Sequence, residues 1–329
     1  MMVQAGWGAA GLLVLAMSHM PVAAQSPTIP VDDSYTVSSR FLANQAAHPD
    51  YRLPVLTTVA GQQILFDRLY KTVGGRELHS DVFLPPAETG SGQAIVLVHG
   101  GGWHSGNKSN FYSMANLLAQ RGYVVVLPEF RLAPEAGYPA GVIDVNDAIR
   151  WTMSQAAEFG IDPQRVAIGG ESSGGQMAAL VAYTGGSTLF SGGSDRAPSV
   201  NALIDIDGVI DFTTPLALAN ENRNDATPAA RWLGGSWEQA PDRWREASAA
   251  THVGPNSPAT LVISGERDRF TAGMEKVLPI LAAHGIPHHH AHFADQPHTF
   301  WLFQPYTSQV VAEIDTFLQD LQPAQTAAP

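Results

Sequence analysis

The 329-residue chain contains no cysteine, and this absence excludes a disulfide framework, a cysteine nucleophile and a thiolate zinc site. Charged residues are also scarce, at 15% of the chain against about a quarter in an average soluble domain. Basic residues are fewer than acidic ones, 18 against 30, and the net charge of −12 without a basic tract argues against nucleic acid as a partner. Because no apolar run reaches about 18 residues, the sequence predicts no membrane-spanning helix.

The N-terminus has the pattern of a targeting segment. Residues 8–17 (GAAGLLVLAM) are apolar, and small residues at Ala23 and Ala24 precede Gln25. This pattern predicts a signal peptide over residues 1–24, cleaved after Ala24, and export to the periplasm or the medium. A disordered apolar start is the alternative, because no lysine or arginine precedes Arg40 to form a basic n-region.

The rest of the chain divides into an arm, one domain and a short tail. Residues 25–59 are polar and interrupted by proline, which is typical of an N-terminal arm. Over residues 60–322 strand patterns alternate with helix patterns, whereas residues 323–329 form a tail. Such alternation predicts an α/β fold with a mostly parallel central sheet flanked by helices. Residues 212–250 interrupt the alternation and are expected to form a small cap insertion.

The periodicity gives the expected elements by residue range. Strands are predicted at 63–73, 77–84, 94–98, 123–127, 166–168, 202–206, 260–263 and 288–293. Helices are predicted at 111–121, 142–159, from 172 onward, 272–284 and 306–321.

A candidate nucleophile follows the strand expected at 166–168. Residues 170–174 (GESSG) form a G-x-S-x-G pattern between that strand and a helix, with Ser172 at its centre. A serine on such a sharp strand-to-helix turn is strained and exposed, and the glycines let the backbone fold tightly around it. The alternative is that Ser172 only caps the following helix. The strand–turn–helix context favours the nucleophile.

Three glycines follow another buried strand. Residues 99–103 (HGGGW) come directly after residues 94–98, and such a loop can direct backbone N–H groups at a substrate oxygen. We expect Gly101, Gly102 and Ser173 to form an oxyanion hole. A phosphate-binding loop is the competing interpretation, but the glycines lack both the Gly-Lys-Ser/Thr ending and the G-x-G-x-x-G run.

A serine nucleophile needs a histidine to take its proton and a carboxylate to orient that histidine. His298, on the loop after the last predicted strand, is the best placed of 12 histidines. For the acid the sequence favours Asp268, which follows the strand at 260–263 and lies further into its loop than Glu266. The chain order Ser172, Asp268, His298 is the one expected of an α/β-hydrolase. Glu266, Asp207 and Asp211 remain competitors for the acid.

Several motifs carry a resemblance to a known family. They are HGGGW at 99–103, PEFRLAPE at 128–135, GESSGG at 170–175, IDGVIDF at 206–212, RWLGGSW at 231–237 and PHTFWLFQPY at 297–306. Over roughly residues 60–322 the chain resembles the hormone-sensitive-lipase-like branch of the α/β-hydrolases, and within it the BD-FAE-like group, relatives of feruloyl and acetyl xylan esterases. The resemblance implies an α/β-hydrolase fold and a serine esterase mechanism that needs no metal or cofactor. It also implies that Ser172, His298 and the Gly101/Gly102 hole act in their family roles.

Other residues have two interpretations each. Trp103 and Trp301 could stack on a substrate or simply pack. The alternating His288, His290 and His292 could bind zinc, or could form the exposed face of an edge strand. Arg267 and Arg269 could recognise a substrate carboxylate or form ordinary surface ion pairs.

Together these features predict an exported serine carboxylic-ester hydrolase. The expected substrate is a short acyl ester, acetyl or feruloyl, on a carbohydrate or small molecule. A general short-chain carboxylesterase or lipase-like enzyme without sugar preference is the first alternative. An inactive hydrolase fold used for binding is the second. The sequence does not indicate an oligomeric state.

Overall fold

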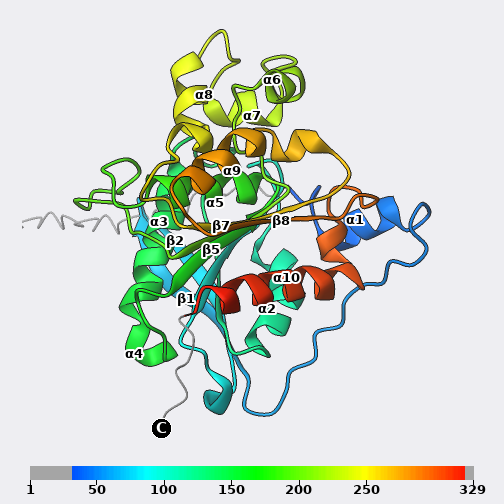
Figure 1. Ribbon diagram of the computed structural model, residues 1–329, viewed down its shortest axis with the longest axis vertical. Helices are drawn as coiled ribbons and strands as arrows, with labels where there is room; N and C mark the ends of the chain where they lie inside the picture. Colours follow the sequence, from blue (N-terminus) through cyan, green and yellow to red (C-terminus); the bar gives the residue numbers. More distant parts are fainter. Residues whose placement is uncertain (1–31, 323–329) are drawn as a thin grey trace, which may run out of the picture.

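Eight strands form one sheet in the computed structural model, which describes residues 32–322 (Figure 1). Their order is β1-β2-β4-β3-β5-β6-β7-β8. The strands are β1 (Gln63–Val73), β2 (Arg76–Leu84), β3 (Ala94–Val98), β4 (Val124–Pro128), β5 (Val166–Glu171), β6 (Ala202–Ile206), β7 (Ala259–Ser264) and β8 (His288–His292). The pairs β1/β2 and β2/β4 are antiparallel and the others are parallel, so the predicted α/β fold with a mostly parallel sheet is confirmed. The predicted signal peptide and the tail lie outside the described residues.

Helices cover both faces of the sheet. They are α1 (Val37–Asn44), α2 (Tyr112–Ala119), α3 (Ala140–Ser154), α4 (Ala156–Phe159), α5 (Ser173–Thr184), α6 (Pro215–Glu221), α7 (Pro228–Leu233), α8 (Pro241–Ala247), α9 (Met274–Ala283) and α10 (Tyr306–Asp320). Helices α3, α5 and α9 pack into one apolar core, and α2 and α10 pack into a second core on the opposite face (Figure 1). Every residue of β3 and β4 is buried, which explains why these strands are continuously apolar rather than alternating.

The predicted elements agree with the structure except at a few boundaries. The helix expected at 142–159 is divided into α3 and α4, and the helix expected at 272–284 is α9, which begins at Met274. The carboxyl ends of β3, β5, β6 and β7 lead into the loops that carry the motif residues. Because parallel strands place these ends at one edge of the sheet, the motifs come together there.

Residues 212–250 contain helices α6, α7 and α8, which lie together at the top of Figure 1. Each of the three has proline in its first turn, where the missing N–H costs no helix hydrogen bond. Trp232 and Trp244 are fully buried and anchor these helices in the core beside α5. The segment is therefore attached to the domain by packed aromatic side chains.

The described part of the arm is folded against the domain. Phe41 of α1 packs on Phe303 with ring centroids 5.8 Å apart, and Tyr51 packs on the same ring at 5.0 Å. Arg52 pairs with Gln304 through two backbone hydrogen bonds. The polar composition did not predict this docking, because it depends on a few aromatic residues that meet partners some 250 residues away in the chain.

No helix within residues 32–322 has the length and apolar character needed to cross a membrane.

Candidate active site

Ser172 occupies a strained turn between β5 and α5. Its backbone angles are φ 55° and ψ −124°, a region that non-glycine residues rarely adopt. A Cβ on Gly170 would lie 2.3 Å from the Gly174 carbonyl oxygen, and one on Gly174 would lie 2.0 Å from that of Val98. Only glycine fits at these two positions, so the G-x-S-x-G pattern here reflects the close approach of strand and helix.

A chain of two hydrogen bonds connects Ser172, His298 and Asp207. The distance from Ser172 Oγ to His298 Nε2 is 2.9 Å, and that from His298 Nδ1 to Asp207 Oδ2 is also 2.9 Å. The second oxygen of Asp207 accepts the N–H of Gly265 at 2.8 Å, and the carboxylate is 1% exposed. Asp207 is therefore held by two contacts in a position that orients the imidazole.

The prediction that Asp268 contacts His298 is wrong. Asp268 begins a short 3-10 helix, Asp268–Thr271, and its side chain is exposed. In the loop after β7 the residue that contacts Asp207 is Gly265, which is buried and donates its N–H to Asp207 Oδ1. The carboxylate on His298 comes instead from the residue directly after β6.

The other two competing carboxylates are engaged elsewhere. Glu266 is exposed and accepts the Arg267 side chain at 3.1 Å. Asp211 pairs with Lys276 at 3.1 Å and accepts two hydrogen bonds from Thr213. Of the four candidates, Asp207 alone makes the contact that a triad acid requires.

The surroundings of His298 favour its neutral form. Burial lowers the pKa of His298, and the hydrogen bond that its Nδ1–H donates to Asp207 acts in the opposite direction. Arg267 and Arg269 contribute to the lowering through charge repulsion. The ring of Phe270 stacks on His298 with centroids 3.5 Å apart, and the Arg269 guanidinium lies 3.9 Å from the Phe270 ring centroid. Sequence reasoning missed Phe270, which covers one face of the imidazole.

All three expected N–H donors lack a protein acceptor in the described structure. Within residues 32–322 the backbone N–H groups of Gly101, Gly102 and Ser173 make no hydrogen bond to the protein. The loop is held in shape by its other members. Gly100 N–H donates to Glu171 at 2.7 Å, and Trp103 N–H donates to the Ser173 hydroxyl at 3.1 Å. The arrangement leaves these three amides available to a substrate oxygen.

The arm reaches this loop through Tyr35. The Tyr35 hydroxyl donates to Glu171 Oε2 at 2.8 Å, while Glu171 Oε1 accepts the Gly100 N–H. Glu171 is fully buried, and burial raises its pKa to about 7. One carboxyl group therefore joins the arm, the turn before Ser172 and the glycine loop. Sequence reasoning found the loop but not this connection.

Two hollows adjoin Ser172. The arm-side cleft, about 520 Å³, has Ser172, His298, Gly101 and α1 residues such as Arg40 in its walls. The cap-side pocket, about 210 Å³, also has Ser172 in its wall and is closed by Trp103, Val209 and residues of helices α6 and α7. A substrate bound at Ser172 therefore has one smaller and one larger compartment available.

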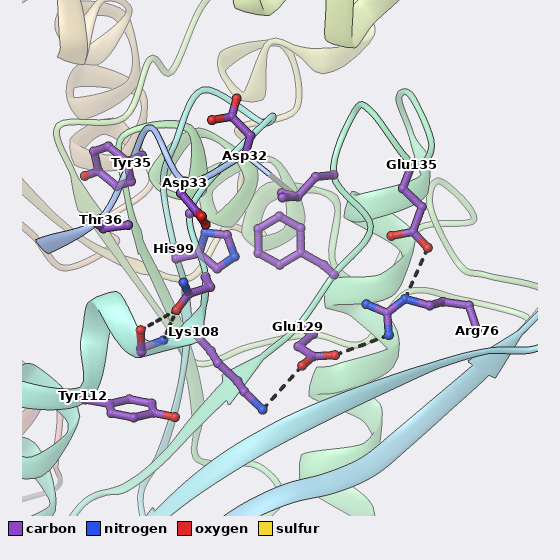
Figure 2. Close-up of a pocket in the computed structure, with 15 residues that line it drawn as sticks. Asp32, Asp33, Tyr35, Thr36, Arg76, His99, Lys108, Tyr112, Glu129 and Glu135 are labelled. Atoms are coloured by element: carbon purple, nitrogen blue, oxygen red, sulfur yellow. Dashed lines mark hydrogen bonds and ion pairs between the residues drawn. The ribbon is translucent and has the colours of Figure 1, made fainter. Parts of the chain in front are cut away.

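A third cavity, of about 310 Å³, lies behind the glycine loop and is drawn in Figure 2. Its two basic side chains, Arg76 and Lys108, are each paired with a carboxylate. Lys108 lies 3.5 Å from Glu129, and Arg76 contacts Glu129 at 3.6 Å and Glu135 at 3.3 Å. Neither Ser172 nor His298 lines this cavity. It carries no catalytic group.

The two tryptophans have different positions. Trp103 lines the cap-side pocket, donates its indole N–H to Gln176 at 3.0 Å and stacks on Trp232 at 5.0 Å. Trp301 is fully buried and lies edge-on behind His298 at 5.0 Å. Its predicted contact with substrate is therefore wrong, because no part of its ring reaches the solvent. Trp301 instead packs behind His298.

The alternating histidines lie on β8, at one edge of the sheet. His288 and His292 are exposed, and the Ser264 hydroxyl contacts His290 at 2.7 Å and His292 at 2.8 Å. In the described part of the chain no group of three His, Asp or Glu side chains has a geometry suited to a metal ion.

Comparison with known proteins gives one family and several relatives. A family model described as BD-FAE matches residues 80–275. The probable carboxylic ester hydrolase LipM of Mycobacterium tuberculosis is 29% identical over 218 residues, which cover 64% of this chain and 48% of LipM. An ethyl acetate hydrolase of Pseudomonas putida is 32% identical over 148 residues, 44% of this chain and 42% of that protein. The chain thus spans about half or less of the length of these curated relatives.

Solved structures share the fold. A thermophilic esterase of Thermogutta terrifontis with bound butyrate aligns with a TM-score of 0.62 and 24% identity, covering 79% of this chain and 94% of that one. A bifunctional GH43-CE protein of Bacteroides eggerthii aligns with a TM-score of 0.64 and 24% identity, covering 78% of this chain and 38% of that one. Both support an α/β-hydrolase fold for residues that carry the site.

Proposed function

Since the chain belongs to the BD-FAE family of α/β-hydrolases, we propose that it is a serine carboxylic-ester hydrolase acting through Ser172, His298 and Asp207. The observation that carries the proposal is the pair of 2.9 Å contacts that joins these three side chains. The names of LipM and of the ethyl acetate hydrolase support the same reaction class.

The first half of the reaction forms an acyl-enzyme. His298 Nε2 takes the Ser172 hydroxyl proton while Ser172 Oγ forms a bond to the ester carbonyl carbon. Asp207 accepts the Nδ1–H and stabilises the imidazolium that results. The carbonyl electrons move to the oxygen, which the N–H groups of Gly101, Gly102 and Ser173 would bind. Each such donor is typically worth about 3 kcal/mol in the transition state.

Collapse of this intermediate breaks the ester C–O bond and releases the alcohol, which takes its proton from His298. A water molecule then gives a proton to His298 and adds to the acyl carbon. The acyl–Ser172 bond breaks, the proton returns to Ser172, and a carboxylic acid leaves. Phe270 and Trp301 keep the imidazole in one orientation throughout, because they contact its face and its edge.

The two compartments support a short acyl group and a larger alcohol. Trp103, Val209 and Pro228 restrict the cap-side pocket, whereas the arm-side cleft has more than twice its volume and includes polar residues such as Ser34 and Asn44. We place the acyl part in the cap-side pocket and a sugar-sized alcohol in the arm-side cleft. Acetyl is favoured over feruloyl on this basis.

A panel of esters tests the substrate class. We expect kcat/KM for 4-nitrophenyl acetate to exceed that for the octanoate at least about ten-fold, because a long chain does not fit the cap-side pocket. Acetylated xylan should release acetate, and methyl ferulate should be a poorer substrate. Equal rates across all chain lengths would contradict the assignment of the acyl pocket. Activity on the nitrophenyl esters without release from xylan would favour a general carboxylesterase.

The pH profile tests the role of His298. Only the neutral imidazole can accept the Ser172 proton, and burial lowers the pKa of His298 below its usual 6.5. We therefore expect kcat/KM to fall at acid pH with an apparent pKa below 6.5. Glu171, whose pKa is about 7, would add a separate inflection. The Glu171→Gln variant should lose that inflection and keep the acid one; an acid limb centred above pH 6.5 in this variant would contradict the assignment.

A further inference from the structure

The arm-side cleft is lined by three arginines from two separate parts of the chain. Arg40 comes from α1 in the arm, and Arg267 and Arg269 come from the segment after β7. Within residues 32–322 no Asp or Glu side chain lines this cleft. The concentration of positive charge beside Ser172 is notable because the chain as a whole carries a net charge of −12.

The three guanidinium groups differ in how far the protein neutralises them. Arg267 pairs with Glu266 at 3.1 Å and Arg269 with Glu221 at 3.2 Å, but both carboxylates lie outside the cleft. Arg40 has no carboxylate within 4 Å among the described residues, and its Nε is buried without a hydrogen-bond partner. Its guanidinium donates to the Ser34 carbonyl oxygen at 3.3 Å and lies 5.8 Å from the centroid of the Tyr35 ring. Arg40 therefore has donors left for a ligand.

The cavity behind the glycine loop differs from the arm-side cleft in how its basic side chains are neutralised. There Lys108 is paired with Glu129 (Figure 2) and, at 2.9 Å, with Asp81, so its charge is already neutralised by protein carboxylates. Such a cavity has no charge to offer an anion. In the arm-side cleft, by contrast, Arg40 has no carboxylate partner among residues 32–322, and it lines the same cleft as Ser172.

The chemistry determines which part of an ester enters this cleft. The leaving alcohol takes its proton from His298, so the alcohol must lie on the side of Ser172 that His298 faces. His298 lines the arm-side cleft, together with its neighbours Pro297 and Thr299. Guanidinium groups bind carboxylates through paired charge-assisted hydrogen bonds.

From this placement we infer that the preferred substrate carries a carboxylate on its alcohol part, as in an acylated hydroxy acid or an acylated acidic sugar. Arg40 and Arg267 bind the carboxylate in the arm-side cleft while the acyl group occupies the cap-side pocket. The inference rests on the proposed function and specifies its substrate class.

The test compares two esters that differ in one charge, 4-acetoxybenzoate and methyl 4-acetoxybenzoate. For the wild-type protein we expect kcat/KM to be at least about five-fold higher for the anionic ester at low ionic strength. Arg40→Gln should reduce the ratio of the two kcat/KM values about five-fold, and Arg267→Gln should reduce it in the same direction. Arg121→Gln, which removes a surface arginine paired with Asp315, is the matched control and should leave the ratio unchanged.

Use of a ratio cancels any general loss of folding or chemistry in a variant. Arg269 is not used, because its guanidinium stacks on Phe270, which covers His298. Hydrolysis of both esters by the wild-type protein without a preference for the anionic one overturns the inference. A ratio that stays unchanged in Arg40→Gln and Arg267→Gln overturns it as well. Either result leaves the proposed function standing. Failure of the wild-type protein to hydrolyse any ester of the panel overturns both.

Discussion

Replacing Ser172 with alanine is expected to lower kcat for 4-nitrophenyl acetate by about 10⁵-fold. The variant keeps the cleft, the glycine loop and His298, but it has no oxygen to form the acyl-enzyme. The residual rate then comes from water and the oxyanion donors alone. Steady-state hydrolysis measures the loss, with Ser154→Ala as the control, since Ser154 is an exposed serine at the end of α3.

The fold of the variant can be verified by thermal unfolding, because Ser172 contributes little to the core. Alanine at this position retains the positive φ, so its stability should stay close to that of the wild-type protein. A variant that unfolds at the wild-type temperature and retains more than about a hundredth of the activity would contradict the role of Ser172.

The second large effect is expected at Asp207. Asp207→Asn should reduce kcat about 10⁴-fold, because an amide can present a donor to His298 Nδ1 and thereby favour the wrong tautomer for proton transfer. Asp268→Asn is the matched control, and kcat should remain near the wild-type value because the Asp268 side chain is exposed and makes no contact with His298.

These two variants separate Asp207, the acid that the structure indicates, from Asp268, the acid that the sequence predicts. A large loss of kcat in Asp268→Asn, together with an active Asp207→Asn protein, would assign the role of triad acid to Asp268 in the loop after β7. Glu266→Gln extends the comparison, since Glu266 lies in the same loop and pairs only with Arg267 in the described structure.

Most of the architecture could be predicted because its signals are local. Continuous apolar runs such as residues 94–98 and 202–206 give buried parallel strands, and the structure places β3 and β6 over those residues. The strand–turn–helix setting of the proposed nucleophile could also be predicted, because a strand, a glycine-bounded serine and a helix follow one another within a few residues around Ser172.

The carboxylate that contacts His298 could not be chosen from the sequence, because the choice depends on the conformation of the loops after β6 and β7. Asp207 and Asp268 each follow a strand and both fit the chain order Ser–Asp–His, and sequence reasoning favoured Asp268 because it follows the strand before the last one. In the structure Asp207 adopts a positive φ of 50° directly after β6, and this conformation brings its carboxylate to both Gly265 and His298. A signal was present, because Asp207 follows its strand immediately whereas Asp268 stands four residues beyond Ser264, the last residue of β7.

The arm was the other feature that sequence reasoning could not place. Its composition is polar, yet Tyr35 donates to the buried Glu171 and Arg40 lines the cleft beside Ser172. Such contacts join residues more than a hundred positions apart, and no local pattern records them. Similarly, nothing in the motif around residue 301 distinguishes a buried Trp301 from one that faces a substrate.

The most direct measurement is to locate the covalent adduct left by an organophosphate ester. The protein is incubated with diethyl 4-nitrophenyl phosphate, digested, and mapped by mass spectrometry. We expect one diethylphosphoryl group per chain on Ser172, formed rapidly in the wild-type protein and greatly slowed in Asp207→Asn. An adduct on another residue, or rapid labelling of the Ser172→Ala variant, would contradict the proposed nucleophile.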